Sequence, residues 1–358
     1  MSNQILEQLE QLWQNVLLPQ SSLSVKRASA EQWQSLIHNK QGLPVDYLWP
    51  VIDYYHQYNL SYAKVAYSFT YVIYQANTAI AIWPINLITT EHGMKLLSNS
   101  GPILPPHFLS PEVSIKNSKK IAKLCLYWAT KVAEFNHIQK LQTVNFSNFT
   151  ATPHWELAWM SHGATISSHY ENIVDLTMAP NEYKKHLSKG ATADIKRSLK
   201  LWRFEHINNM SIEQRDMFCA LHYKVAGKVT RSPESWESQR QLINQGVSFA
   251  VFAFSEKEQL IGAAQFIYSH DFATYAFGAY DRSLFHLPIA HGAQQLAIDY
   301  LQQRGIRSYL LGQRFFVGET PPPTAKECSI GQFKSSFANS YGLKHTFTLA
   351  LSTSIYDE

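Results

Sequence analysis

Residues 247–269 read VSFAVFAFSEKEQLIGAAQFIYS, two apolar runs that are separated by a charged turn at residues 255–259. This pattern predicts a β-hairpin. Working outward, we expect another strand over residues 272–282, an amphipathic helix over 289–305 and a further strand over 306–312. The order of three strands, a helix and a strand indicates an α/β unit with a mostly antiparallel sheet.

The first half of the chain repeats this order of elements with little sequence identity. Two β-rich segments cover residues 64–75 and 78–89, and a proline-rich loop follows them. An amphipathic helix is expected over residues 118–136 and a strand over 141–148. The fold class is therefore α/β (α+β), with two tandem units that each hold a mixed, mostly antiparallel sheet flanked by helices.

The composition agrees with a globular chain of two domains. The chain has 358 residues, of which 45% are hydrophobic and 16% charged. We place the domain boundary near residue 165, which gives domains over residues 1–165 and 166–358. The aromatic content of 13% suits a large core, and it also suits clefts that bind extended or sugar-like ligands.

Charge and cysteine content narrow the function classes. A net charge of +4 is too small to indicate a DNA-binding protein. Three scattered cysteines form no metal-binding motif, so we expect no metal, and they suit a reducing compartment. Neither a signal peptide nor an apolar window of membrane-spanning length is present, and we expect a cytoplasmic protein.

Residues 181–203 form a basic segment, in which Asn181 is a possible helix N-cap and Gly190 a break between two helices. Lys196 and Arg197 follow that break. These charges form either an ordinary solvated face or a surface that attracts a phosphate-bearing precursor, a tRNA or a cofactor diphosphate.

Residues 221–236 read LHYKVAGKVTRSPESW and combine large polar groups with aromatic rings. One interpretation is a cleft wall, where His222, Tyr223 and Trp236 contact substrate and Arg231 binds a carboxylate or phosphate in bidentate fashion. The other interpretation is an exposed helix and turn with incidental charges. The sequence leaves both open.

Near the end of the chain, residues 329–338 read SIGQFKSSFA. On a helix, Phe333 and Phe337 share one face and anchor it to the core, while Lys334 points elsewhere. Pro321 to Pro323 precede this segment and form a possible flap. Lys334 is either a rigidly mounted site residue or a lysine that faces solvent.

Several catalytic motifs are absent from the sequence, among them those of serine hydrolases, zinc proteases, P-loop NTPases and Rossmann dehydrogenases. What remains is chemistry that works by positioning two substrates, such as transfer of a group to an amine.

Four stretches together resemble the Fem-type peptidyl and aminoacyltransferases. They are DIKRSLK (194–200), LHYKVAGKVTRSPESWESQ (221–239), LIGAAQFIYSHDFATYAFGAYDRSLFHLPIAHGAQQLAI (260–298) and IGQFKSSFA (330–338). The closest resemblance is to the Fem-like proteins of the GNAT superfamily that occur in bacterial surface-polysaccharide loci. It extends over about residues 165–345. It implies two GNAT-like domains side by side and formation of an amide bond on an amine of a cell-wall or glycan precursor.

The resemblance also implies roles for individual residues. Lys334 would bind a substrate carboxylate or stabilise the oxyanion, and His222, Asp281 or the substrate itself would accept the proton of the amine. The remaining candidates would bind substrate or cofactor. The substrate group, which includes residues that hold the acceptor or a phosphate of donor or acceptor, is Arg231, Tyr223, Trp236, Gln313, Lys196, Arg197 and Phe333. The cofactor group is His291 and Gly292.

Two departures from the GNAT pattern concern the donor and the base. The turn before the helix at residue 289 offers Gly292 alone, which leaves few backbone amides for the pyrophosphate of acetyl-CoA. The strand that ends near Gln313 carries no acid. We therefore expect no tightly bound cofactor, and the donor is either an acyl-CoA or an aminoacyl-tRNA.

A second function class remains open, a non-catalytic GNAT-like module that binds a nucleotide-sugar or a glycan. For the transferase, the expected partners are a small-molecule acyl donor and an amine acceptor. A tRNA is a possible partner, as is peripheral contact with a lipid-linked substrate, and DNA is not expected.

Overall fold

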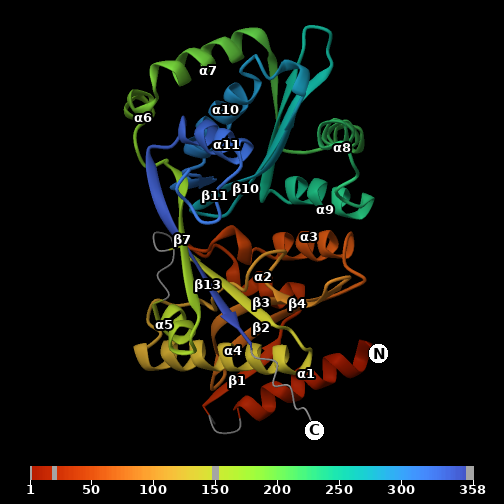
Figure 1. The fold of residues 1–358 in the computed structure, drawn as a ribbon, viewed down its shortest axis with the longest axis vertical. Helices are drawn as coiled ribbons and strands as arrows, with labels where there is room; N and C mark the ends of the chain where they lie inside the picture. The colour runs from red at the N-terminus through yellow and green to blue at the C-terminus, as the bar shows by residue number, and fades with distance from the viewer. Residues whose placement is uncertain (1, 18–21, 147–152, 352–358) are drawn as a thin grey trace. The chain divides into compact units, whose positions relative to one another are not determined.

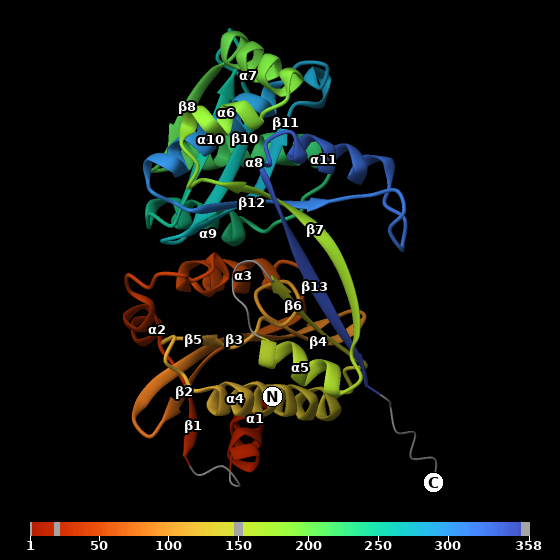
Figure 2. The same cartoon turned by 90° about the vertical axis from the view of Figure 1, so that its left-hand side faces the viewer.

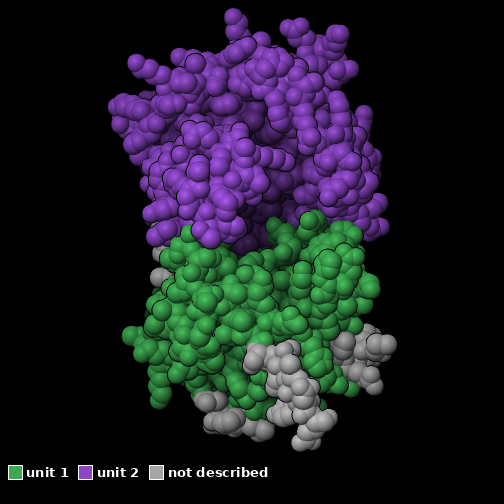
Figure 3. Space-filling model, in the orientation of Figure 1, with its two compact units in different colours: residues 1–39, 55–168, 344–358 green, residues 40–54, 169–343 purple. Residues whose placement is uncertain are grey.

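The computed structural model describes residues 2–17, 22–146 and 153–351, which form two compact units (Figure 3). Unit 1 comprises residues 1–39, 55–168 and 344–358, and unit 2 comprises residues 40–54 and 169–343.

The elements of unit 1 are mostly contiguous in sequence (Figure 1). They are α1 (Ser2–Leu17), β1 (Leu23–Arg27), α2 (Ala30–Ile37), β2 (Val65–Gln75), β3 (Thr78–Thr90), β4 (Gly93–Leu97), β5 (His107–Phe108), α4 (Ile115–Phe135), β6 (Lys140–Phe146) and α5 (Pro153–Ser161). The strand expected over residues 141–148 is β6, and residues 147 and 148 lie outside the described residues.

Unit 2 contains the elements that carry the predicted site (Figures 1 and 2). They are η1 (Val45–Tyr47), α6 (Pro180–His186), α7 (Lys189–Leu201), β8 (Arg203–Ile207), α8 (Ile212–Ala226), α9 (Pro233–Asn244), β9 (Ser248–Phe254), β10 (Leu260–Tyr268), β11 (Phe272–Tyr280), η2 (Arg282–Leu284), α10 (Ile289–Gln303), β12 (Ser308–Arg314) and α11 (Ala325–Ser335). Three elements contribute residues to both units: α3 (Trp49–Leu60), β7 (Thr165–Asp175) and β13 (Ser340–Ala350).

The chain passes between the units at residues 168 and 169, near the expected boundary, but two exchanged segments were not expected. Residues 40–54 pack in unit 2, where the Gly42 N–H donates to Asp271 Oδ2 (2.5 Å). The Gln239 amide also donates to the Tyr54 hydroxyl there (3.1 Å). Residues 344–350 of β13 pair with β6 in unit 1.

The sheets confirm the predicted fold class. In unit 1, β1, β2, β3 and β4 are neighbours in that order, and all their pairings are antiparallel. In unit 2 the strand order is β13-β7-β12-β11-β10-β9-β8. The hairpin expected over residues 247–269 is β9 and β10. The pairing of β11 with β12 is parallel, because α10 lies between them as a crossover helix.

The core of unit 1 is rich in tryptophan. Trp13 of α1 stacks on Trp128 of α4 with ring centroids 4.9 Å apart. Trp83 of β3 meets Trp128 edge to face at 5.7 Å, and Trp155 lies 6.2 Å from Trp83. All four rings are at least 96% buried, which indicates that these positions serve packing.

A β-bulge in β11 decides which side chains face which helices in unit 2. Phe266 is opposite Tyr275, but Gln265 is opposite Phe277, so Ala276 is an extra residue. Tyr275 therefore packs in the core under α7 and α10. Phe277 packs in the core under α8 and α9, on the other face of the sheet.

The helix boundaries of the basic segment differ from our expectation. Helix α6 begins at Pro180 with Ala179 as its cap residue, so Asn181 is not the N-cap. The chain breaks at residues 187 and 188, where the Ser188 hydroxyl accepts the Ala191 N–H (3.1 Å) and caps α7. Proline favours the first helical position and serine the N-cap, and these local preferences set the boundaries. Gly190 lies inside the first turn of α7 rather than between the helices.

No helix in the described part of the chain is long and apolar enough to cross a bilayer.

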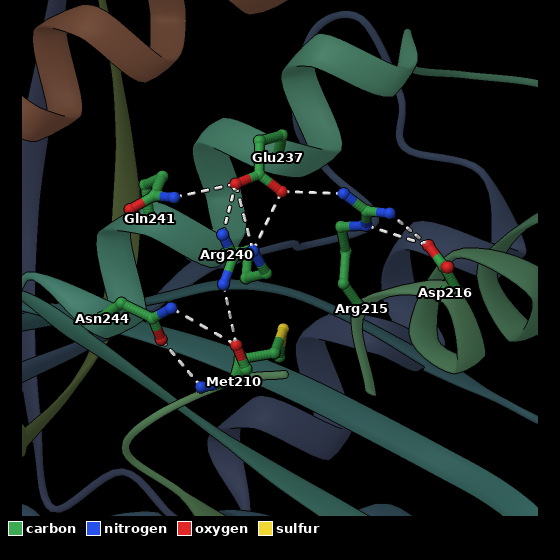
Figure 4. Close-up of polar contacts among 7 residues, drawn as sticks. All are labelled: Met210, Arg215, Asp216, Glu237, Arg240, Gln241 and Asn244. Atoms are coloured by element: carbon green, nitrogen blue, oxygen red, sulfur yellow. Dashed lines mark hydrogen bonds and ion pairs between the residues drawn. The ribbon is translucent and has the colours of Figure 1, made fainter. Parts of the chain in front are cut away.

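Helices α8 and α9 are held together by a polar network around Glu237 (Figure 4). Its carboxylate accepts hydrogen bonds from Arg215 (2.7 Å), Arg240 (2.6 Å) and Gln241 (2.8 Å). Arg240 also donates to the Met210 carbonyl (3.2 Å), which ties α9 to the residues just before α8. The hydrogen bond from Arg240, above all, lowers the pKa of Glu237 to about 2.

The Glu237 network predicts a stability that depends on pH. Because the folded pKa lies below the ordinary value of 4.5, the contribution of the network to stability is present above about pH 4.5 and is lost as the pH falls toward 2. The side chain is 36% exposed, so solvent screening limits the loss in Glu237→Gln to about 1 kcal/mol near neutral pH. Urea unfolding near neutral pH and at about pH 3 tests this. The difference in the free energy of unfolding between Glu237→Gln and wild type should be smaller at about pH 3 than near neutral pH.

The matched control is Glu256→Gln, which changes an exposed carboxylate in the β9–β10 turn that makes no hydrogen bond or ion pair within the described residues. A Glu237→Gln variant as stable as this control near neutral pH would show that the network contributes nothing.

Gly292 allows α10 to approach α7 and β8. A Cβ at this position would lie 2.5 Å from Phe204 Cζ and 2.6 Å from Ser198 Oγ. The buried Ser198 hydroxyl accepts the Gly292 N–H (3.0 Å) and donates to the Ile289 carbonyl (3.2 Å). The absence of a side chain at residue 292 is thus a packing requirement.

We expect Gly292→Ala to lower the free energy of unfolding by about 1–3 kcal/mol, because neither neighbour can move out of a packed core. Gly190→Ala is the control, since its Cβ would meet only Ser188 Oγ, at 3.8 Å. That variant should be unchanged or more stable by up to about 1 kcal/mol. Denaturant unfolding compares the two, and equal stabilities would contradict the packing role.

Candidate functional site

A cavity of about 680 Å³ opens in unit 2 beside β11. Its wall is formed by residues of α7, β11, the segment before α10, the first turn of α10 and α11. It brings together four residues that the sequence singled out: Lys334, Phe333, Arg197 and His291.

The cavity exists because two parallel strands separate. The pairing of β11 with β12 is limited to residues 272–274 of β11 and 308–310 of β12. Residues 275–278 of β11 line the cavity immediately beyond the last pair. Within the described residues no strand pairs with this edge of β11 after Thr274, so its backbone groups are available to a ligand.

Lys334 reaches the cavity across a glycine. A Cβ at Gly312 of β12 would overlap Lys334 Nζ, so the ammonium occupies the place of a side chain there. Gly312 has φ +111°, a conformation that suits glycine. Lys334 Nζ lies 5.9 Å from the centroid of the Tyr275 ring. Burial lowers the pKa of the Lys334 ammonium, and the nearby Glu171 carboxylate opposes this shift.

The helix that carries Lys334 is fixed by a buried amide. The Asn172 side chain of β7, which is fully buried, donates to the Gly312 carbonyl (3.1 Å) and accepts the Ser335 hydroxyl (2.7 Å). A Cβ at Gly331 would lie 3.1 Å from the Phe315 backbone nitrogen. The glycine of the Gly-x-Phe-Lys stretch therefore permits close contact between α11 and the end of β12.

The two phenylalanines are placed as expected. Phe333 and Phe337 lie with ring centroids 5.4 Å apart, and Phe337 is fully buried. Phe333 also contacts the His291 ring at 5.0 Å and lines the cavity. Burial lowers the pKa of His291, and Asp194 opposes this shift.

Four other predicted residues form a separate cluster on α8, α9 and the loop between them. His222 Nε2 is 3.0 Å from Arg231 Nη1. The Tyr223 hydroxyl donates to the Arg231 carbonyl (2.8 Å) and accepts the indole N–H of Trp236 (3.1 Å). The Arg231 guanidinium lies 4.4 Å from the centroid of the Phe277 ring. Phe277 is itself a residue of the cavity wall, so the cluster touches the wall through it.

This cluster braces the wall rather than lining the cavity. Burial, above all, and the Arg231 charge lower the pKa of His222 to about 4, so its imidazole is neutral and accepts a hydrogen bond from Arg231. None of His222, Tyr223, Arg231 and Trp236 is among the residues of the cavity wall.

The remaining predicted residues also lie outside the wall. Asp281 accepts hydrogen bonds from Lys224 Nζ (2.7 Å) and from Ser283; the Lys224 bond, above all, lowers its pKa. The Gln313 amide donates to Glu319 (3.4 Å). Lys196 is exposed on α7, and Gly292 packs on Phe204 as described above.

Several residues of the site were not predicted from the sequence. Tyr275 and Tyr280 line the cavity, and Gly278 leaves room for both rings. Asn172 gave no usable signal, because it follows Glu171 in a largely polar strand and only the fold buries it. The bulge that turns Tyr275 toward the cavity has no signature in the sequence.

No protein-family model matches the sequence, and no curated protein matches it either. Solved structures do match the fold. FemX superposes with a TM-score of 0.64 at 10% identity, covering 92% of this chain and 97% of that one. L-PGS from Bacillus licheniformis gives a TM-score of 0.55 at 10% identity, with 90% and 92% covered.

A tandem GNAT protein from the clavulanic acid biosynthesis pathway matches with a TM-score of 0.50 at 12% identity, covering 92% of this chain and 98% of that one. Identities this low establish the fold alone. The sequence resemblance is confirmed at that level: this chain has a Fem-like, tandem GNAT-type fold.

Proposed function

We propose that this protein is an N-acyltransferase or aminoacyltransferase that forms an amide bond on an amine of a cell-envelope or glycan precursor. The observation that carries the proposal is the Lys334 ammonium, held over Gly312 in the cavity where β11 and β12 separate. The shared fold supports a transferase, because the similar structures include proteins named as a GNAT protein and as a putative lysylphosphatidylglycerol synthetase.

Lys334 supplies the positive charge that acyl transfer requires. As an amine attacks the acyl carbonyl, negative charge develops on the carbonyl oxygen. A partly buried ammonium stabilises that charge more strongly than a solvated one. The unpaired edge of β11 supplies backbone groups that can align an extended acyl chain beside it.

The start of α10 bears on the choice of donor. The His291 N–H already donates to the Pro288 carbonyl (3.2 Å), and the Gly292 N–H donates to Ser198. These amides are not available to the diphosphate of a coenzyme A. The hydrogen bonds of these two amides therefore favour aminoacyl-tRNA over acyl-CoA as the donor. The exposed Lys196 and Arg197 of α7 also suit a polyanion such as tRNA.

The alternative is a non-catalytic module that binds a nucleotide-sugar or glycan. The aromatic residues Tyr275, Tyr280, Phe285 and Phe333 of the cavity wall favour it, since sugar rings stack on aromatic faces. Ligand-induced stabilisation by glycans without any amide product would distinguish it from the transferase.

We expect Lys334→Ala to lower the rate of amide formation by about 10²–10³-fold, because the developing oxyanion loses its charged partner. The assay incubates the protein with acyl-CoAs or charged tRNAs and a panel of amines, and detects amide products by mass spectrometry. Thermal unfolding reports whether the fold is kept.

The matched control is Lys326→Ala, which removes an exposed lysine from the first turn of the same helix. It should transfer at the wild-type rate. If a folded Lys334→Ala protein is as active as this control, the role of Lys334 is wrong.

A further inference from the structure

Asp194 and His291 face each other at the cavity wall without direct contact. Asp194 Oδ2 lies 3.8 Å from His291 Nε2, which is beyond hydrogen-bond distance. Asp194 is the one carboxylate among the residues that line this cavity. His291 Nδ1 is buried without a hydrogen-bond partner within the described residues. An amine that lies to one side of the line between these two atoms can be within hydrogen-bond distance of both.

The surroundings of His291 keep its imidazole neutral and fixed. Its ring lies 5.0 Å from that of Phe333 and 5.6 Å from that of Phe337, and 19% of the side chain is exposed. Burial holds its pKa below the ordinary value of 6.5, so the ring can accept a proton near neutral pH.

Charged and titratable groups reach this part of the cavity from every neighbouring element. Helix α7 contributes Asp194 and Arg197, α11 contributes Lys334, the segment before α10 contributes His286, and β11 contributes Tyr275 and Tyr280. Arg197 and Lys334 suit the negative groups of an acyl donor or an oxyanion. Asp194 attracts the opposite charge, and its carboxylate repels a phosphate at the start of α10.

We propose that Asp194 and His291 form the subsite for the primary amine of the acceptor. The Asp194 carboxylate binds the ammonium group, and His291 Nε2 takes one proton from it. This inference rests on the proposed transferase function and adds where the acceptor binds and which residue is the base.

His291 and the leaving group take the two protons that the amine loses. The ammonium gives one proton to His291, and the neutral nitrogen bonds to the acyl carbon. The bond from that carbon to the leaving oxygen or sulfur of the donor then breaks, and the leaving atom takes the second proton of the nitrogen. The imidazolium at His291, stabilised by Asp194, finally releases its proton to water.

An NMR titration of the full chain tests the subsite without turnover. Histidine labelled at Cε1 reports the ring, and His291→Asn assigns its signal among the 15 histidines. The probes are D-glucosamine and ethanolamine, each compared with its N-acetyl form, which lacks the ammonium. We expect the two free amines to shift the His291 signal and their N-acetyl forms to leave it unchanged.

Asp194→Asn supplies the second measurement. It should weaken binding of the amine probes about tenfold or more, as for loss of a hydrogen bond to a charged group. It should also lower the pKa of His291, because the Asp194 charge raises that pKa. Glu213→Gln, an exposed carboxylate of α8, is the control that should change neither value.

The inference is overturned if the amines leave the His291 signal unchanged in wild type, or if Asp194→Asn binds them as well as the control does. Amide formation at the wild-type rate in both Asp194→Asn and His291→Asn would also reject it, while the transferase function would stand. Amine binding at His291 with no amide product from any donor would reject the transferase and keep the subsite.

Discussion

The site of unit 2 depends on the short parallel pairing between β11 and β12. Three residue pairs hold the strands together, and beyond Thr274 and Leu310 they separate. The crossover through α10 requires the strands to be parallel, so the ends that separate are both carboxyl ends. Ligands of open α/β sheets bind at such ends. The start of α10, which follows β11, and α11, which follows β12, are brought to the same opening.

The bulge at Ala276 places Tyr275 and Phe277 of β11 on opposite faces of the sheet. Tyr275 faces the cavity side and lies near the ammonium of Lys334. Phe277 faces the opposite core, where the Arg231 guanidinium stacks on its ring. The Arg231 guanidinium attracts the face of the Phe277 ring and so helps to hold this part of β11 in place. The residues around Arg231 thus support the site from outside.

The β-rich segments of both halves and the helices over residues 118–136 and 289–305 could be predicted from the sequence, because hydrophobic patterning marks them. Contact between Phe333 and Phe337 was expected from helical spacing, and it is present although Phe337 lies just past the end of α11. The role of Gly292 could not be predicted, because its neighbour Phe204 lies on another strand and nothing local reveals the overlap. His222 was a reasonable candidate base from the sequence alone. Its bond to Arg231 and its place behind the wall depend on tertiary packing.

The exchanged segments and the helix caps show two different reasons why parts of the fold are hard to predict from the sequence. The exchange of residues 40–54 rests on Asp271, which is more than 200 positions away, so no local pattern indicates it. The start of α6 was misplaced by a local competition between Pro180 and Asn181. There the deciding preference, that of proline for the first helical turn, is local and present in the sequence.

The hydrogen bonds of the Asn172 amide make the position of Lys334 depend on elements that are far apart in the sequence. Its partner Ser335 is 163 positions away in sequence, and closing so long a loop is slow compared with forming a hairpin. The Asn172 side chain makes both hydrogen bonds only when β12 and α11 are packed against β7. The lysine is therefore in place only when the elements that Asn172 joins, β7, β12 and α11, are packed together.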